Sequence, residues 1–206
     1  MEFEFEGRLY RRDEFGVINQ VDKKPFKYDS SYINIYNQQK YTQTAKVLNN
    51  IRLNYLMSYF FSPPESLLDV GCGNGSFLQA CIGKINTLYG FDVVNTMLPD
   101  SIIKVYEFVE ASVYTFWDSL EHIWDISFLE NLPTRMVAVS VPWYYGEFKN
   151  WRHYKPDEHI RYFTLDALTN MFEHYGWTLL NYGDVEDVVR EPINGNPNIL
   201  TAIFRK

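Results

Sequence analysis

Short apolar runs and helical patterns alternate along the chain from residue 65 onward. The first run covers 66–70 and leads through a glycine-rich turn into a helical pattern over 76–82. The elements expected after it are strand 87–92, strand 102–109, strand 111–117, helix 126–132, strand 136–141, helix 165–175, strand 177–182 and strand 199–204. Such alternation predicts an α/β fold in which helices cover both faces of a mostly parallel sheet, closed by an antiparallel strand.

The segment before residue 63 has a different pattern. Four side chains at spacings of three and four residues predict a helix over 42–61: Leu48, Ile51, Tyr55 and Tyr59. Three tyrosines recur every four residues before it, a spacing that fits a helical turn or a tyrosine-lined lid: Tyr28, Tyr32 and Tyr36. We therefore expect residues 1–62 to form a helical lid and residues 63–206 to form one compact domain.

The length and composition fit one α/β domain with an additional short segment. The chain has 206 residues, of which 46% are hydrophobic, so its core needs no metal or disulfide staples. The formal net charge of −7 lacks the Lys and Arg excess with which non-specific nucleic-acid binders neutralise phosphates. Its two cysteines form no C-x-x-C pair. No apolar run approaches the ~20 residues of a membrane-spanning helix, and the first residues lack the basic and apolar regions of a signal peptide. We expect a cytoplasmic protein without membrane contact and disfavour nucleic acid as a partner.

Three alternating glycines follow the first expected strand of the domain. Gly71, Gly73 and Gly75 allow a tight turn and let a ligand approach the backbone. Asp92 ends the next strand, where a carboxylate can accept hydrogen bonds from both ribose hydroxyls of a nucleotide. A dinucleotide fingerprint requires G-x-G-x-x-G, which this loop lacks. Asp69 precedes the loop, and its charge would repel a pyrophosphate but suits an ammonium or sulfonium group.

Several segments resemble class I S-adenosylmethionine-dependent methyltransferases. Residues 68–75 (L-D-V-G-C-G-N-G) and 89–92 (Y-G-F-D) resemble their first and second motifs. Residues 115–123, with the segment D-S-L-E-H, are similar to the subgroup that includes the ubiquinone-biosynthesis O-methyltransferases. Residues 153–164 resemble small uncharacterised methyltransferases that are often carried by bacteriophages. The resemblance implies a Rossmann-like, doubly wound sheet of seven strands, with S-adenosyl-L-methionine as cofactor.

The same resemblance implies a set of cofactor-binding residues. They are Asp69, Gly71, Cys72, Gly73, Asn74, Asp92, Val93, Trp117 and Asp118. Within this set, Asp69 would face the α-ammonium group, Asp92 would hold the ribose hydroxyls, and Val93 would pack near the adenine. Trp117 and Asp118 would line the sulfonium side. The acidic residue that would contact the adenine edge stays open between Glu107 and Glu110.

The candidates for catalysis are His122 and His159. Methyl transfer mainly requires alignment of the nucleophile, and an imidazole can remove a proton from a hydroxyl or an acidic carbon. The alternative for His122 is a histidine that holds a loop. His153 and Glu158 extend the set of possible metal ligands, but no H-x-E or H-E-x-x-H spacing is present, so the sequence predicts no metal.

The sequence leaves the methyl acceptor and the oligomeric state open. We expect a small-molecule acceptor, because no N-P-P-Y-type tetrapeptide follows the fourth strand. Five rings crowd the stretch after the fifth strand, 136–141, and either wall the acceptor or pack among themselves: Trp143, Tyr144, Tyr145, Trp151 and Tyr154. Two other functions stay open, a non-catalytic cofactor- or partner-binding protein on the same fold and an NAD-dependent oxidoreductase.

Overall fold

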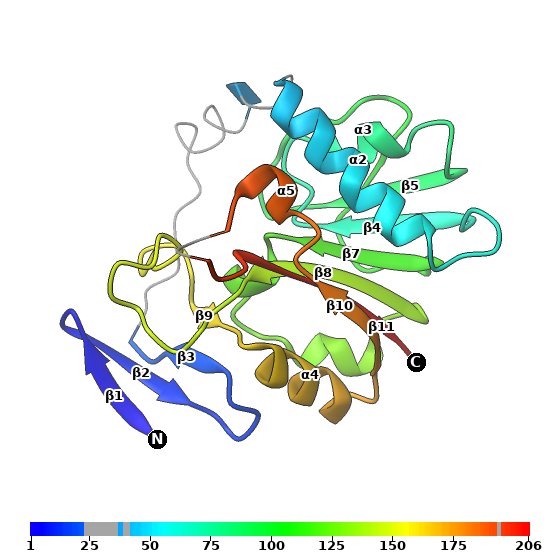
Figure 1. Ribbon diagram of the computed structural model, residues 1–206. Helices are drawn as coiled ribbons and strands as arrows, with labels where there is room; N and C mark the ends of the chain where they lie inside the picture. Colours follow the sequence, from blue (N-terminus) through cyan, green and yellow to red (C-terminus); the bar gives the residue numbers. More distant parts are fainter. Residues whose placement is uncertain (23–36, 39–41, 193–194) are drawn as a thin grey trace.

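A seven-stranded sheet forms the centre of the computed structural model, which describes residues 1–22, 37–38, 42–192 and 195–206. Its order is β10-β11-β8-β7-β4-β5-β6 (Figure 1). The strands are β4 (Ser66–Val70), β5 (Thr87–Phe91), β6 (Ile103–Val105), β7 (Val113–Trp117), β8 (Met136–Pro142), β10 (Thr178–Gly183) and β11 (Ile199–Arg205). The five strands from β8 to β6 run parallel, and β11 is antiparallel to both of its neighbours. The predicted Rossmann-like sheet is confirmed.

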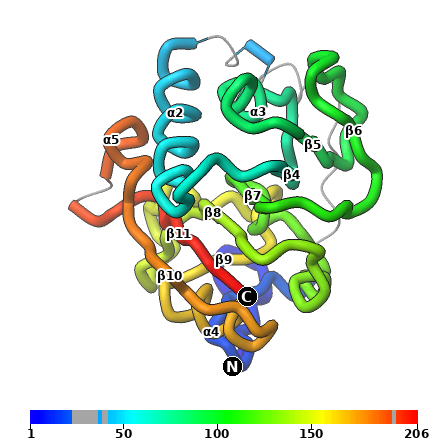
Figure 2. Tube along the Cα trace, turned by 90° about the vertical axis from the view of Figure 1, so that its right-hand side faces the viewer, coloured from blue at the N-terminus to red at the C-terminus, as the bar shows by residue number. Residues whose placement is uncertain are grey.

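Helices cover both faces of this sheet. Figure 2 shows α2 (Gln43–Met57) and α3 (Ser76–Cys81) on one side and α4 (Leu165–His174) on the other. Neighbouring residues of one strand enter opposite core clusters, with Leu67 facing α2 and Leu68 facing α4. Strand β7 is buried along its whole length, as expected for a central parallel strand covered on both faces.

The remaining elements of this domain are short. They are the 3₁₀ turns η1 (Leu120–His122) and η2 (Ser127–Asn131) and the helix α5 (Asp187–Arg190). The third predicted strand, expected over 102–109, is shorter and covers 103–105, and the ring of Phe108 beyond it lies 5.2 Å from that of Phe91. None of the helices in the described ranges combines the length and apolar character that crossing a bilayer requires.

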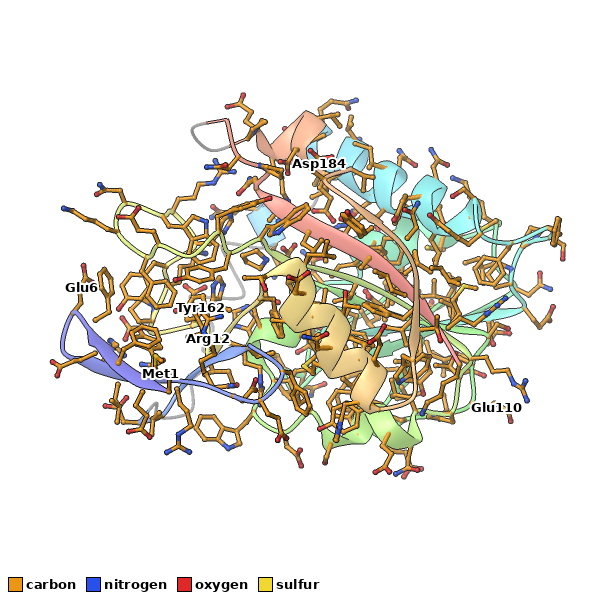
Figure 3. All side chains as sticks on the ribbon, turned by 60° about the horizontal axis from the view of Figure 1, so that its bottom comes forward. Met1, Glu6, Arg12, Glu110, Tyr162 and Asp184 are labelled. Atoms are coloured by element: carbon orange, nitrogen blue, oxygen red, sulfur yellow. The ribbon has the colours of Figure 1, made fainter. Side chains whose placement is uncertain are left out.

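The start of the chain forms strands, whereas we expected residues 1–62 to form a helical lid. A second sheet has the order β1-β2-β3-β9, from β1 (Glu2–Phe5), β2 (Arg8–Arg12), β3 (Ile18–Gln20) and β9 (Arg161–Tyr162). Alternating acids and aromatics give β1 the period of a strand. Glu6 and Gly7, with φ of 50° and 72°, form the two-residue turn that favours a hairpin, and Figure 3 places Glu6 at its tip.

The aromatic stretch after β8 packs onto this second sheet. Tyr144 and Phe148 are buried in one cluster with Tyr10, Ile18 and Tyr162, and Figure 3 shows Tyr162 between the N-terminal strands and the larger domain. The stretch therefore anchors the second sheet to the domain. Among the described residues of this segment, 43–57 form α2 and 37–38 are also helical, and the expected tyrosine repeat at 28, 32 and 36 lies outside the described residues.

Candidate functional site

A cavity of 770 Å³ opens where β4, β5 and β7 end. In a parallel α/β sheet this edge is the usual place for a ligand. The structure brings all the predicted site residues to the wall of this one cavity: Asp69, Gly71, Cys72, Gly73, Asn74, Asp92, Val93, Trp117, Asp118, His122 and His159.

The glycine loop is fixed by backbone contacts to the neighbouring strands. The N–H groups of Gly71 and Cys72 both donate to the carbonyl of Phe91, at 2.8 and 3.1 Å. Gly71 has a φ of +79°, and a Cβ at this position would lie 2.5 Å from the Cβ of Ser119. Only glycine fits here without displacing backbone, because both the dihedral angle and the close approach exclude a side chain.

Asp92 closes the cavity on the side of β5. One carboxylate oxygen accepts the N–H of Gly73 at 2.7 Å, and the other accepts the N–H of Val94 at 2.8 Å. These bonds hold the carboxylate in one orientation, and each oxygen keeps a second lone pair for a further donor. Val93 lies beside it with 79% of its surface exposed, so it offers an apolar contact to a ligand.

Asp69 is a buried carboxyl group at the base of the cavity. The hydroxyl of Thr115 donates to its Oδ1 at 2.6 Å. Burial raises the pKa of Asp69 to about 7, although the hydrogen bond from Thr115 and the charge of Arg52 act in the opposite direction. A cation bound next to this group would favour its ionised form.

A network of two arginines and two carboxylates forms another wall of the cavity. Arg52 donates to Glu186 through Nε at 2.7 Å and to Asp118 through a terminal nitrogen at 2.6 Å. Arg190 also binds both carboxylates. Burial opposes ionisation of Asp118, but the charges of Arg190 and Arg52 outweigh it and lower its pKa. Both oxygens of Asp118 are thus held by arginines while the residue lines the cavity.

This network was not predicted from the sequence, because the buried face of α2 lies one position from the face we expected. The fully buried side chains are Asn49, Arg52, Leu53 and Leu56, whereas the predicted face of Leu48, Ile51, Tyr55 and Tyr59 is only half-buried. Burial of Arg52 is tolerated because Glu186 and Asp118 bind it. The available signal was an arginine directly beside the leucines of an amphipathic helix.

A third group of polar side chains lies in and after η1. The rings of His122 and His159 meet edge to face with centroids 4.8 Å apart. Glu121, which is 1% exposed, lies beside His122. Burial raises the pKa of Glu121 and, together with the charge of His122, lowers the pKa of His159. His159 is therefore neutral at physiological pH, and a neutral imidazole carries a lone pair for a proton or a metal ion.

Other candidates from the sequence lie away from the cavity. Neither Glu107 nor Glu110 is among the described residues that line it, whereas Phe108 is, and Figure 3 shows Glu110 at the surface, at the opposite end from the N-terminal strands. The five rings of the aromatic stretch, from Trp143 to Tyr154, are also absent from the described lining.

Comparison of the sequence with protein families adds a decisive observation. Residues 39–182 match the family described as "Methyltransferase domain". The chain belongs to this methyltransferase family. The match spans both α2 and the whole parallel part of the sheet, so the methyltransferase domain includes the helix that carries Arg52. A comparison with curated proteins gave no match.

Solved structures share the fold of this methyltransferase. The 1,6-didemethyltoxoflavin-N1-methyltransferase of Burkholderia thailandensis, solved with 1,6-didemethyltoxoflavin and S-adenosylhomocysteine, is 14% identical with a TM-score of 0.64, covering 99% of this chain and 97% of that chain. An S-adenosylmethionine-dependent methyltransferase of Clostridium acetobutylicum is 11% identical with a TM-score of 0.57, covering 85% and 97%. One from Mesorhizobium loti is 13% identical with a TM-score of 0.55, covering 76% and 98%. At these identities the likeness concerns the fold.

Proposed function

We propose that this methyltransferase binds S-adenosyl-L-methionine in the cavity at the ends of β4, β5 and β7 and transfers its methyl group to a small-molecule acceptor. The observation that carries the proposal is the arrangement of Asp92 and Asp69 around the glycine loop. One carboxylate is fixed at the rim by two backbone N–H groups, and the other is buried at the base.

The loop is better suited to a sulfonium nucleoside than to a dinucleotide. A pyrophosphate site needs backbone N–H groups that point at the ligand. Here the N–H groups of Gly71 and Cys72 donate to Phe91, and that of Gly73 donates to Asp92. The two carboxylates add negative charge, which opposes an anion and favours a cation. These features disfavour NAD as the cofactor.

Different residues contact different parts of the cofactor. Asp92 accepts hydrogen bonds from the ribose hydroxyls, Val93 and Phe108 pack beside the adenine, and Asp69 faces the α-ammonium group. Gly71 and Gly73 let the methionine portion approach the loop backbone. The remaining predicted contacts, on the loop and the sulfonium side, come from Cys72, Asn74, Trp117 and Asp118.

The acceptor binds on the side of η1 and the segment before β9. The cofactor supplies a methyl group on a positively charged sulfur, so the protein mainly aligns the nucleophile and shields it from water. His122 and His159 lie on this side of the same cavity and serve as the catalytic candidates. Of the expected lid, 1–62, the described residues that line the cavity are Asn37 and four residues of α2, so α2 is the part that covers the cofactor. A net charge of −7 favours a small acceptor over a long nucleic acid.

The D-S-L-E-H segment at 118–122 links this chain with the small methyltransferases that bacteriophages often carry. We place the protein among them because of that segment and residues 153–164.

The alternative function is a non-catalytic protein on the same fold that senses or binds the cofactor without turnover. It predicts binding of the cofactor with no methylated product.

Isothermal titration with S-adenosylhomocysteine tests the proposal. We expect saturable binding of one molecule per chain, and no binding of NADH in a parallel fluorescence titration. A folded sample that gives no heat with S-adenosylhomocysteine, or one that binds NADH instead, contradicts it. Incubation with radiolabelled S-adenosylmethionine and pools of small metabolites then separates an enzyme, which transfers the label, from a binding protein, which does not.

A further inference from the structure

Three potential metal ligands converge on the acceptor side of the cavity. Glu121 and His122 come from η1, and His159 comes from the turn before β9. One ligand atom from each lies within 4.8 Å of the others, and all three residues line the cavity. The turn at η1 and the chain before β9 are held together by the N–H of Ile160, which donates to the carbonyl of Glu121 at 3.0 Å.

Both imidazoles are oriented by backbone carbonyls. Nδ1 of His122 lies 3.1 Å from the carbonyl of Glu158, and Nδ1 of His159 lies 3.0 Å from the carbonyl of His153. A carbonyl only accepts hydrogen bonds, so each Nδ1 carries a proton, and in the neutral form of each ring Nε2 then carries the lone pair. Metal-binding histidines show this arrangement, in which the second nitrogen donates to a carbonyl or a carboxylate.

The carboxyl group of Glu121 provides the independent observation. The residue is 1% exposed, and its Oε2 has no hydrogen-bond partner among the described residues. Burying a polar atom without a hydrogen-bond partner costs free energy of folding. One recognised reason for such an atom in a native protein is that it binds an ion. The nearby Arg52 and Arg190 do not supply it, because they bind Glu186 and Asp118.

We propose that Glu121, His122 and His159 bind one divalent transition-metal ion, with Zn²⁺ as the best match to two imidazole nitrogens and one carboxylate oxygen. A set of three protein ligands leaves a coordination position open, as in catalytic zinc sites. Ligand atoms at ~2.1 Å from one ion lie roughly 3–4 Å apart, so the side chains close by about an ångström when the ion binds. The sequence predicted no metal, because the three ligands lie on two separate segments.

The open position gives the metal a place in the reaction, and this step rests on the proposed function. It faces the cavity that also holds the predicted cofactor residues, so it takes an oxygen of the acceptor. A metal-bound hydroxyl loses its proton to solvent at lower pH than a free one. The resulting oxygen attacks the methyl carbon, an O–C bond forms, the C–S bond breaks, and S-adenosylhomocysteine leaves. The acceptor class is therefore a compound with a hydroxyl or enol oxygen.

Metal titration of the full chain tests the site. After treatment with a chelator, Co²⁺ is added and the visible absorption of the bound ion is followed, with Zn²⁺ as competitor. We expect one ion per chain, with affinity reduced at least about tenfold in Glu121→Gln and in His159→Asn. The matched control is His174→Asn, which removes an exposed histidine of α4 outside the cavity and should leave the affinity unchanged.

Failure of the wild-type chain to bind an ion, or equal affinity in all variants, overturns the proposal. If the two variants do not fold, the anomalous signal of Zn²⁺ in wild-type crystals decides: a peak among the three side chains supports the site, and a peak elsewhere or none overturns it. S-adenosylhomocysteine binding is measured on the same samples. If the chain binds the metal but not S-adenosylhomocysteine, only the proposed function is contradicted. If it binds S-adenosylhomocysteine but not the metal, only the metal site is contradicted.

Discussion

Two carboxyl groups in the cavity have different environments and therefore different roles. Asp92 is held at the rim by the N–H groups of Gly73 and Val94, which stabilise its charge. Asp69 is buried at the base, where its carboxyl group accepts a hydrogen bond from the hydroxyl of Thr115. In the proposed function, the first is a fixed acceptor for the ribose hydroxyl groups, and the second is a group whose ionisation responds to the ammonium group of the cofactor.

Replacing Asp92 by alanine should weaken cofactor binding without unfolding the chain. Loss of hydrogen bonds from two ribose hydroxyls to a charged acceptor costs about 1–3 kcal/mol, which corresponds to an affinity roughly 5- to 150-fold lower. Calorimetric titration with S-adenosylhomocysteine measures the change. Asp100→Ala is the control, because Asp100 is exposed and outside the described lining. Equal affinity in both variants would show that Asp92 has been misassigned.

The affinity for S-adenosylhomocysteine should rise with pH through the pKa of Asp69. Burial raises that pKa to about 7 in the ligand-free chain. Below it the carboxyl is neutral and must lose a proton before it can pair with the ammonium group, so binding weakens by up to about tenfold per pH unit. Titrations at pH 6, 7 and 8 test this, and Asp69→Asn should remove the dependence. A pH-independent wild type would contradict the contact.

At the level of elements, α2 is attached to the domain by charge as well as by apolar packing. Arg52 reaches across to Glu186 of α5's N-terminal turn and to Asp118 after β7. Its guanidinium also lies 5.2 Å from the ring centre of Trp117, a cation–π contact. Ser140 of β8 donates to the same carboxylate of Glu186. Arg52 therefore connects α2 with the end of β7 and with the start of α5.

Replacing Arg52 by methionine should destabilise the fold. The substitution keeps most of the apolar stem but leaves the fully buried Glu186 with Arg190 as its remaining cation. Removing one partner of a buried ion pair costs about 3–5 kcal/mol of unfolding free energy, and urea denaturation measures it. Lys46→Met changes an exposed cation of the same helix and should alter stability by less than about 0.5 kcal/mol. Comparable losses in both variants would refute the role of the network.

At the scale of the whole molecule, two sheets and one aromatic cluster define the architecture. The large sheet places the ends of β4, β5 and β7 around the cavity, and the small sheet joins residues 2–20 to β9. The connection is made by the rings that follow β8, with Phe148 packed between Tyr10 and Tyr162 at centroid distances of 5.1 and 4.7 Å. The segment just before β9 also carries His159, so the small sheet supports the part of the cavity wall where we propose that the acceptor binds.

The strands of the large sheet and the glycine loop could be predicted because their signals are local. The apolar residues of a run such as 66–70 indicate a buried strand, and a glycine at position 71 indicates a tight turn. Asp69, near the end of β4, and Asp92, directly after β5, are placed by the same logic, since the carboxyl ends of neighbouring parallel strands meet at one edge. The small sheet escaped prediction, although the alternation of β1 and the Glu6–Gly7 turn carried its signal.

The sequence by itself therefore determined the fold class, the cofactor loop and Asp69 and Asp92 beside it. Only the tertiary structure decided the partners of buried charge, as for Arg52 and Glu186, 134 residues apart, and brought Glu121 close to His159. The physical reason is that burial of an ion depends on a partner from a distant segment, and such a partner leaves no periodic trace in the chain around either residue.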